Sequence, residues 1–321
     1  MTSATSTMRA AVLAGPRRLL LAEVARPSPG PGEALVRLEG CGVCGSNLVP
    51  WQGRDWFRYP FPPGAPGHEG WGRVVALGPG AVGVEEGDRV ALLSGAAFAE
   101  LEAAPASQLV RLPPGLAGPF PGEALGCAVN VFRRSRIAPG DTVAVVGAGF
   151  LGLGVIRLAA RAGARVLALS RRAHALHWAR RLGAAEVRAT GDADGAAWVL
   201  EATGGRGADV VVEAVGEQAS LDLATRAVRT EGRLVIAGFH QDGLRTVDLC
   251  SWNWRGLTLV NAHVRDAAEQ RAGLAEAARL AAEGALDLAP LCRPFPLERI
   301  GEAFEALERR PDGFVKAVVT P

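Results

Sequence analysis

The sequence predicts an α/β protein of two domains, in which a β-rich domain is followed by a domain built on a parallel sheet. Residues 8–110 hold short runs of alternating apolar and polar residues, separated by glycine and proline, and this pattern is typical of an all-β domain. From about residue 122, apolar runs alternate with helical patterns, which indicates βαβ units. A chain of 321 residues is long enough for two domains of ordinary size.

The β-rich part combines short strands with one long loop. Residues 50–67 are rich in proline and aromatic residues, and a loop of this length is usually functional or disordered. Its aromatic side chains favour packing, either within the domain or against a substrate. The predicted strands are Arg9–Ala14, Glu33–Gly40, Gly72–Leu77 and Arg89–Leu93.

The second part begins with a predicted helix, Ala124–Arg134, and a buried parallel strand, Thr142–Val146. The alternation continues to a last strand at Leu257–Val264, and a tail of two helices and a strand follows. The elements in between are the helices Phe150–Ala162, His174–Leu182 and Leu221–Val228, and the strands Arg165–Leu169, Val210–Glu213 and Arg233–Ala237. The tail consists of the helices Ala267–Glu283 and Leu297–Glu308 and the strand Phe314–Val319.

Charge and cysteine usage argue against several classes of protein. The formal net charge is +2 and the basic residues are spread along the chain, so nothing favours a nucleic-acid or membrane partner. The five cysteines are odd in number and scattered, unlike a secreted disulfide framework. We see no signal peptide and no apolar run as long as a membrane span, so we expect a cytoplasmic protein. Residues 1–7 are interpreted as a frayed tail or a mis-assigned start.

A glycine-rich motif, GAGFLG at residues 147–152, follows one predicted strand and opens the next predicted helix. The motif alone is a weak signal, but this context is the one that dinucleotide binding requires. Gly149 lets the backbone approach the pyrophosphate, and the helix N-terminus supplies N–H groups and positive potential. The residues expected to contact the cofactor here are Gly147, Gly149, Phe150, Leu151 and Gly152.

Four side chains ahead of this motif can bind a metal. Cys44 supplies a thiol, His68 an imidazole, and Glu69 and Glu123 carboxylates. This donor set suits zinc, and a catalytic zinc keeps one position open. Beside a dinucleotide, a metal that polarises an alcohol oxygen indicates hydride transfer. The alternatives are a buried apolar Cys44 and a Glu123 that only stabilises a helix N-terminus. Cys41 forms a C-x-x-C with Cys44, but no second pair exists, so we expect Cys41 in the core.

In the order and spacing of these motifs, the chain resembles zinc-dependent members of the medium-chain dehydrogenase/reductase superfamily, on the polyol (sorbitol-type) and threonine dehydrogenase side. The resemblance runs nearly end to end, from Met8–Val12 to Gly313–Lys316. It implies a GroES-like, β-rich catalytic domain over residues 1–126 and 265–321. It also implies a Rossmann domain with a doubly wound parallel sheet, which binds NADP, over residues 127–264.

The resemblance assigns roles to the metal-site residues. Cys44 and His68 correspond to zinc ligands, and Glu123 stands at the spacing of the third metal-site residue of polyol dehydrogenases. Glu69 either ligates zinc or stays behind the ligands while a water molecule takes the position. Ser46 corresponds to the hydroxyl that hydrogen-bonds the alcohol oxygen and takes its proton. These five residues form the expected catalytic set.

The chain also departs from the family pattern. Asn47 stands where an aspartate is usual and Val49 where many members have a relay histidine, so the proton must leave by another route, such as the ribose hydroxyl or water. Only Ser94–Ala97 separates the strand Arg89–Leu93 from Phe98, so the four-cysteine lobe that often holds a structural zinc is absent. We therefore predict one zinc ion per chain.

The choice of cofactor depends on the end of the second strand of the α/β domain. An enzyme that uses NAD has an acidic residue there for the ribose, whereas this chain has Ser170, Arg171 and Arg172. Guanidinium groups suit phosphate, which indicates NADP; the alternative is that arginine is simply abundant in this chain. Cys127 lies one helical turn beyond Glu123 and is expected near the nicotinamide. Further predicted cofactor contacts are Ala214, Gly238 and Lys316.

These expectations combine into one predicted function with two alternatives. The predicted function is that of a zinc- and NADP-dependent alcohol dehydrogenase or ketone reductase acting on a secondary alcohol of a polyol, a sugar-like compound or an amino alcohol. The alternatives are a zinc-free enone or quinone reductase of the same superfamily and a catalytically inactive nucleotide-binding protein. The apolar strand Leu257–Val264 ends the sheet, so we expect its edge to pair in a homodimer or homotetramer.

Overall fold

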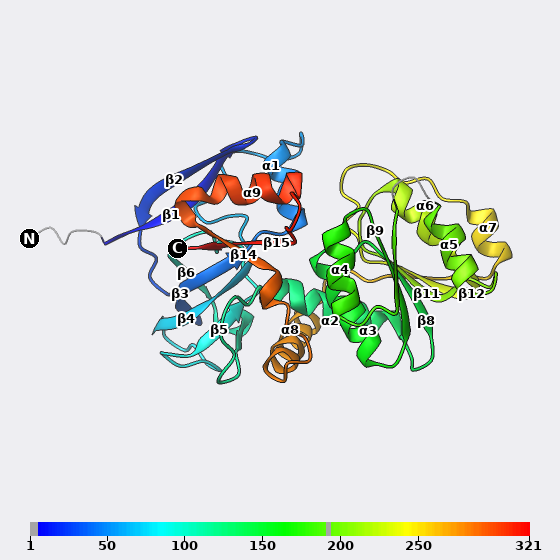
Figure 1. Ribbon diagram of the computed structural model, residues 1–321. Coiled ribbons are helices and arrows are strands. Elements are labelled where there is room, and N and C mark those ends of the chain that lie inside the picture. The colour runs from blue at the N-terminus through cyan, green and yellow to red at the C-terminus, as the bar shows by residue number, and fades with distance from the viewer. Residues whose placement is uncertain (1–5, 191–193) are drawn as a thin grey trace, which may run out of the picture. The chain divides into compact units, whose positions relative to one another are not determined.

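The computed structural model describes residues 6–190 and 194–321 (Figure 1). The frayed start expected for residues 1–7 falls mostly outside this part, although Thr7 already begins a strand. The chain divides into two units, of which the first contains Met1–Gly126 and Gln270–Pro321 and the second contains Cys127–Glu269. Within the described residues, no helix is both long enough and apolar enough to span a membrane.

The first unit is built mainly on antiparallel strands, and the predicted all-β pattern lies within it. A hairpin, β1–β2, stands beside a seven-stranded sheet in the order β14-β15-β3-β4-β5-β7, in which β6 also pairs with β3. The strands are β1 Thr7–Gly15, β2 Arg18–Ala25, β3 Glu33–Gly42, β4 Glu69–Leu77, β5 Arg89–Leu92, β6 Leu101–Pro105, β7 Leu109–Arg111, β14 Cys292–Pro296 and β15 Lys316–Thr320. The helices are α1 Leu48–Gln52 and α9 Ile300–Arg309, with α2 Gly122–Ser135 and α8 Ala267–Ala282 crossing the boundary between the units.

Aromatic residues join the long loop to the core of this unit. Phe304 on α9 packs against Trp51 and Phe98, with ring centroids 5.3 and 5.6 Å away. Tyr59 is partly buried against the same core, whereas Trp56 remains 59% exposed. The expected packing of the loop is therefore found within the domain for most of its aromatic side chains, and Trp56 is the exception.

The C-terminal strand completes the sheet that carries the predicted metal-site residues. β15 lies between β14, to which it is parallel, and β3, to which it is antiparallel. Val318 pairs with Gly42 at the end of β3, and Gly42 in turn pairs with Glu69 at the start of β4. The tail thus lies in the first unit, and it places the end of the chain beside two of the predicted metal-site segments.

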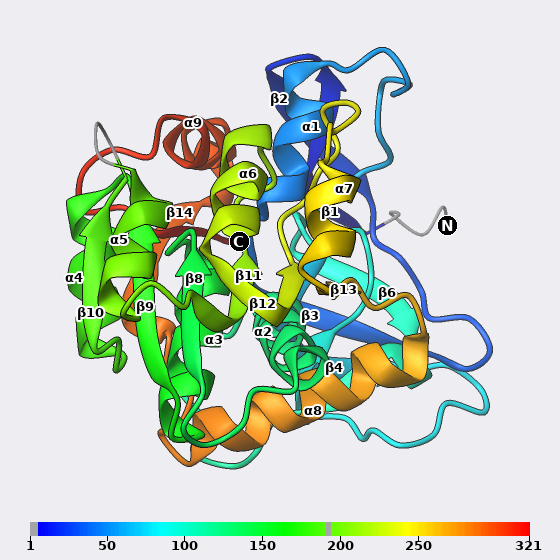
Figure 2. The same cartoon turned by 90° about the vertical axis from the view of Figure 1, so that its right-hand side faces the viewer.

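The second unit is a doubly wound α/β domain. Its six parallel strands follow the order β10-β9-β8-β11-β12-β13, and they lie side by side in Figure 2. Helices α3 and α4 cover one face of the sheet, and α5 and α6 cover the other (Figure 1). The strands are β8 Thr142–Val146, β9 Arg165–Ser170, β10 Glu186–Ala189, β11 Ala208–Glu213, β12 Val228–Ile236 and β13 Thr258–Asn261. The helices are α3 Phe150–Arg161, α4 Ala173–Arg181, α5 Gly195–Ala202, α6 Gln218–Ala227 and α7 Leu249–Trp254.

Several predicted elements differ from the structure. The elements β10, α5 and α7 were not predicted, because each is too short to show a clear period and β10 is partly exposed. The predicted strand Leu257–Val264 shortens to the four residues of β13. The predicted helix Leu297–Glu308 begins with a 3₁₀ turn, and its α-helical part starts only at Ile300.

Candidate active site

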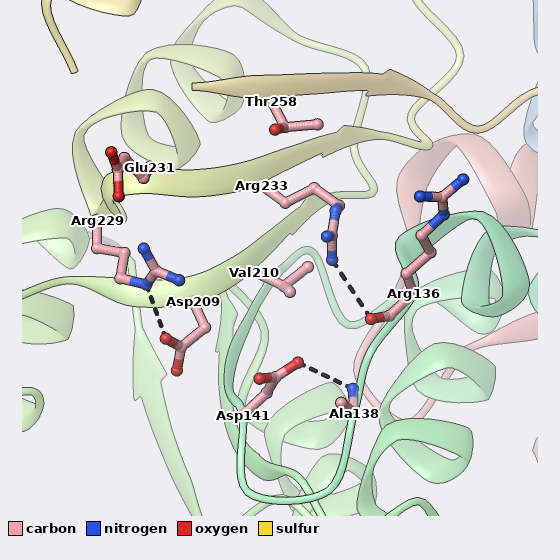
Figure 3. A pocket seen from close by; sticks show the side chains of 9 residues that line it. All are labelled: Arg136, Ala138, Asp141, Asp209, Val210, Arg229, Glu231, Arg233 and Thr258. Carbon is pink, nitrogen blue, oxygen red and sulfur yellow. Dashed lines mark hydrogen bonds and ion pairs between the residues drawn. The ribbon is translucent and has the colours of Figure 1, made fainter. Parts of the chain in front are cut away.

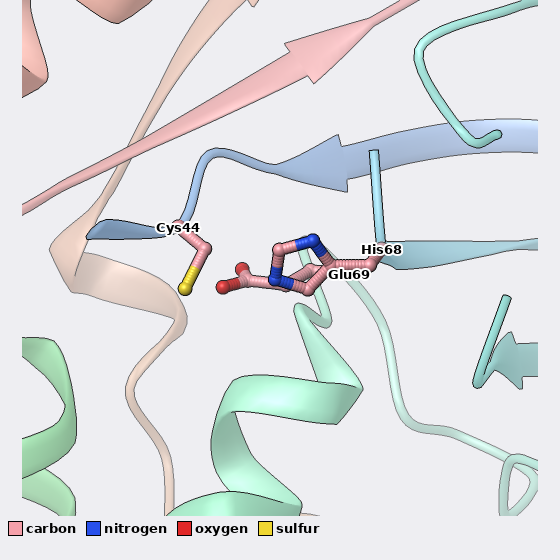
Figure 4. A group of neighbouring side chains, drawn as sticks. All are labelled: Cys44, His68 and Glu69. Atoms are coloured by element: carbon pink, nitrogen blue, oxygen red, sulfur yellow. The ribbon is translucent and has the colours of Figure 1, made fainter. Parts of the chain in front are cut away.

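Three of the four predicted metal-site residues come together in the first unit (Figure 4). Cys44 follows β3 and His68 precedes β4, and the antiparallel pairing of these strands brings the two loops together. One ligand atom each from Cys44, His68 and Glu69 lies within 4.8 Å of the others. Gly42 is required here, because a Cβ atom at this position would lie 1.9 Å from the Glu69 carboxylate. The local backbone is therefore shaped around this carboxylate.

Asn47 hydrogen-bonds the backbone of Cys44 and of Pro66, the residue whose carbonyl also binds His68. Its side-chain oxygen accepts a hydrogen bond from the Cys44 N–H at 2.8 Å, and its amide nitrogen donates to the Pro66 carbonyl at 2.9 Å. The Nδ1 of His68 lies 2.9 Å from the same carbonyl, so the ring donates through Nδ1 and keeps Nε2 for another partner. A carboxylate at position 47 could not donate to Pro66. The departure from the usual aspartate therefore exchanges a charge for one additional donor.

Ser46 lies at the same site. Its hydroxyl oxygen is 3.4 Å from His68 Nε2, the nitrogen that faces away from Pro66. The hydroxyl, the imidazole and the Cys44 sulfur thus border a common space at the end of β3. A hydroxyl in this position can exchange a hydrogen bond with an oxygen held beside the donor atoms.

Lys316 forms a buried ion pair with Glu69. Its Nζ atom lies 2.7 Å from Oε1 and 2.5 Å from Oε2, and both side chains are almost completely buried. Burial lowers the pKa of Lys316, but the charges of Glu69 and Cys44 outweigh this effect and raise it. Lys316 was predicted to contact the cofactor, whereas in the structure its ammonium group binds Glu69, a predicted metal-site residue. Sequence reasoning missed this role, although the only lysine of the chain was a usable signal.

The negative charges of the neighbouring residues act on His68. Burial alone would lower the pKa of His68, but the hydrogen bond to Cys44 and the charges of Cys44, Glu123 and Glu69 raise it to about 10. An imidazole that retains a proton so strongly marks a position where the surrounding donors favour a cation. Glu123 acts on His68 through its charge from the first turn of α2, but in the described part of the chain it is not among the three clustered ligands.

Cys41 is a core residue, as expected. Its side chain is fully buried in the apolar core of the first unit, and burial raises the pKa of its thiol well above the usual value. Of the two cysteines in the C-x-x-C, only Cys44 belongs to the cluster of described ligand residues.

The glycine-rich motif forms a tight turn between β8 and α3 in the second unit. Gly147 has φ +104°, which favours glycine, and a Cβ on Gly152 would lie 1.9 Å from the Gly147 carbonyl oxygen. A Cβ on Gly149, in contrast, would meet no atom within 4 Å. The backbone at the start of α3 is therefore open to a ligand, and helix N-termini of this kind bind phosphate.

The other predicted cofactor residues of this unit lie mostly at the same sheet edge. Ser170 ends β9 and is buried, and its hydroxyl accepts a hydrogen bond from the Arg172 N–H at 3.3 Å. Ala214 directly follows β11, and Gly238 lies two residues after the end of β12. Arg171 is largely exposed and lies 3.5 Å from Glu217. The remaining predicted residue, Cys127, is half-buried on α2 at the start of the unit.

A polar network at this edge was not predicted. Glu213, at the end of β11, is fully buried and accepts hydrogen bonds from the N–H groups of Val215 and Gly216, both at 2.8 Å. It also accepts from the Ser220 hydroxyl at 2.7 Å and lies 2.9 Å from His240 Nε2. The turn after β11 is therefore held rigidly. The sequence signal for this network, a glutamate that ends an apolar strand, was too general to indicate it.

A surface pocket lies at the opposite edge of the same sheet (Figure 3). Arg229 is bonded to Asp209 at 2.8 Å, and Arg233 donates to the Ser135 carbonyl at 2.8 Å. Because ligands of such sheets bind at the carboxyl ends of the strands, and because these charges already have partners, we assign no ligand to this pocket. Its lining residues are Arg136, Ala138, Asp141, Asp209, Val210, Arg229, Glu231, Arg233 and Thr258.

A β-rich unit with a clustered thiol, imidazole and carboxylate, together with a doubly wound unit with a glycine-rich turn, is the combination that we expect of a nucleotide-dependent dehydrogenase. Comparison with known families agrees. The model of the alcohol dehydrogenase GroES-like domain matches residues 30–114, and that of the zinc-binding dehydrogenase matches residues 151–283. The chain belongs to the zinc-type medium-chain dehydrogenase superfamily.

Individual relatives support this membership. The erythritol/L-threitol dehydrogenase of Mycolicibacterium smegmatis is 32% identical over 275 residues, which cover 72% of this chain and 76% of the relative. The 2R,3R-butanediol dehydrogenase of Bacillus subtilis superposes with a TM-score of 0.84 at 26% identity, covering 98% of this chain and 99% of the other. The structure described as a putative zinc-binding dehydrogenase from Sinorhizobium meliloti 1021, bound to NADP, has a TM-score of 0.84 and 26% identity and covers 98% of this chain and 100% of the other.

Proposed function

We propose that this protein is a zinc-dependent dehydrogenase that transfers hydride between NADP(H) and a secondary alcohol or the matching ketone. The observation that carries the proposal is the cluster of Cys44, His68 and Glu69 ligand atoms within 4.8 Å. Sulfur, nitrogen and carboxylate donors suit zinc, and Glu123 is the fourth residue of the proposed set. A zinc-free reductase has no need of this set of donors, so the rival enone or quinone reductase is disfavoured.

The proposed chemistry divides between the ligands and the protein. When bound, zinc would supply a Lewis acid for the substrate oxygen, and NADP(H) would supply the hydride acceptor or donor. Asn47 and the Pro66 carbonyl orient His68, and Lys316 keeps the Glu69 carboxylate in place. Ser46 is positioned to hydrogen-bond the substrate oxygen and take its proton, in a site where Val49 cannot pass the proton on.

The proposed substrate is a secondary alcohol of a polyol, a sugar-like compound or an amino alcohol. The erythritol/L-threitol and 2R,3R-butanediol dehydrogenases are named for polyol and diol substrates, and an L-galactonate-5-dehydrogenase of Escherichia coli is 26% identical over 98% of this chain. In a screen with matched concentrations, we expect a polyol or 1,2-diol to give the highest kcat/KM. If ethanol or an aromatic primary alcohol exceeded every polyol and diol, the substrate assignment would be wrong, whereas the cofactor assignment would be unaffected.

The proposed cofactor is NADP, which depends on Ser170 and Arg171. Ser170 can donate a hydrogen bond to a 2′-phosphate that an aspartate would repel, and Arg171 can add a charge-assisted contact. We expect NADP to exceed NAD at least about tenfold in kcat/KM. The double variant Ser170→Asp/Arg171→Ala should reverse this preference while its zinc content stays unchanged. Equal or better use of NAD by the unmodified enzyme would contradict the assignment.

Assembly and location complete the proposal. The edge strand β13 exposes Leu259, and the neighbouring α7 exposes Leu249 and Trp254. An apolar sheet edge of this kind favours pairing between copies, so we propose a homodimer or homotetramer. We further propose a cytoplasmic enzyme whose partners are small molecules and not nucleic acid or membrane.

A further inference from the structure

Glu217 and Arg171 bridge the open edge of the nucleotide-binding sheet. Arg171 follows β9, Glu217 follows β11, and both strands are neighbours of β8 on opposite sides. Neighbouring strands lie about 4.8 Å apart, so the two loops are separated by roughly 10 Å at the level of the sheet. The guanidinium Nη2 and the Glu217 Oε1 nevertheless lie 3.5 Å apart. The pair therefore crosses the carboxyl end of β8, where the glycine-rich turn begins.

The two ends of this bridge differ in rigidity. The turn that carries Glu217 is fixed, because the buried Glu213 carboxylate binds the N–H groups of Val215 and Gly216. The Glu217 N–H lies 3.2 Å from the Ser220 hydroxyl at the start of α6. The Arg171 side chain is 66% exposed, and the Glu217 carboxylate is the acidic group that it faces. The long, exposed side chain of Arg171 can thus change its position, whereas the backbone of Glu217 is held in place by the turn.

The bridge occupies the region where the adenosine half of a dinucleotide belongs. Phosphates bind at the start of α3, and the ribose lies at the end of the second strand of the domain, which here is β9 with Ser170. A 2′-phosphate beside Ser170 would need the same guanidinium that Glu217 now holds. An exposed ion pair is weak, so a phosphate with almost two charges can displace the carboxylate.

We propose that Glu217 is a cofactor-specificity residue that holds Arg171 across the glycine-rich turn until a 2′-phosphate takes its place. The inference builds on the proposed use of NADP. Glu217 then lowers the affinity for every ligand that carries the 2′-phosphate, because the Arg171–Glu217 ion pair must break before Arg171 can bind the phosphate. The affinity for ligands without this phosphate stays nearly the same. Glu217 therefore reduces the preference for NADP over NAD that Ser170 and Arg171 create.

Binding of two mononucleotides by the intact protein tests the proposal without relying on turnover. Isothermal titration calorimetry would give Kd for adenosine 2′,5′-bisphosphate and for 5′-AMP. Glu217→Gln should bind the bisphosphate about twofold to fivefold more tightly than the unmodified protein, with the Kd of 5′-AMP unchanged. Glu186→Gln is the matched control, because Glu186 pairs with Arg165 at the opposite edge of the same sheet; neither Kd should change.

A second background separates the role of Arg171 from simple charge repulsion. In Arg171→Gln, the additional change Glu217→Gln should leave the Kd of the bisphosphate where it was. If Glu217→Gln tightened binding equally in both backgrounds, or in neither, the proposal would be overturned. A wild-type protein that does not discriminate between the two nucleotides would instead contradict the use of NADP. If Glu217→Gln then created a preference for the bisphosphate, Glu217 would still be the residue that withholds Arg171.

Discussion

Replacing Cys44 by serine should remove the zinc ion and lower kcat/KM by a factor on the order of 10³ or more, while the protein stays folded. The side chain provides the sulfur of the donor cluster, and a hydroxyl is a poor ligand for zinc. A metal that polarises the reacting oxygen contributes several kcal/mol, and each 1.36 kcal/mol corresponds to a factor of ten in rate. Zinc per chain is measured by elemental analysis, and turnover with the best alcohol from the screen.

The exposed Cys250 on α7 provides a matched control. Cys250→Ser changes the same atom on the surface of the other unit, and it should leave both the zinc content and the rate unchanged. The unmodified protein should contain one zinc per chain, since Cys44 is the only cysteine in a ligand cluster of the described residues. Full activity of metal-free protein would overturn the assignment, and two tightly bound zinc ions would show that a second site had been overlooked.

Local signals made the nucleotide-binding part predictable. The predicted strand Thr142–Val146 coincides with β8, because an apolar run followed by a glycine motif leaves few alternatives. The structure also shows why two positions of this motif are glycine. Gly147 has a positive φ, and a Cβ on Gly152 would lie too close to the Gly147 carbonyl oxygen. Short elements such as β10 lacked such a signal, and their existence depends on packing against neighbours.

The residues of the proposed metal site could be picked out from the sequence, but the contacts that support them could not. Cys44, His68 and Glu69 come from two segments whose motifs are recognisable one by one. The partner of Glu69 lies 247 positions away on the last strand, and only the pairing of β15 with β3 brings it close. In the same way, Asn47 was noticed as a departure, but its hydrogen bond to Pro66 depends on a fold that no local pattern encodes.

The charged residues at the sheet edge also have contacts that could not be predicted from the sequence. Arg171 was predicted as a phosphate-binding residue because of its place after the second strand. That a carboxylate from the turn after β11 would lie beside it follows from the strand order, in which β9 and β11 flank β8. Pairings across a sheet of this order are set by tertiary structure, so sequence reasoning identified one partner and missed the other.

Replacing Lys316 by methionine should lower the thermal midpoint of unfolding by about 6–20 °C while the zinc content stays near one per chain. The ammonium group is the buried partner of a fully buried carboxylate, and removing one member of such a pair costs about 3–5 kcal/mol because the other charge is left uncompensated. For a domain of this size, each kcal/mol shifts the midpoint by about 2–4 °C. Lys316 is not itself one of the clustered ligand residues, and Cys44 and His68 keep their ligand atoms in the variant, so the metal should be retained.

Two further variants identify the cause of this loss. Lys316→Met combined with Glu69→Gln removes both charges. The midpoint should rise again by a large part of the decrease, because burying a neutral amide costs less free energy than burying an unpaired carboxylate. Arg279→Met breaks two exposed ion pairs, with Glu276 on α8 and with Glu283 just after it, and should move the midpoint only slightly. The midpoints are read by differential scanning calorimetry on the zinc-loaded protein. If Lys316→Met alone were as stable as the unmodified protein, Glu69 would not depend on Lys316 for its charge balance, and the metal would be the more important counter-charge.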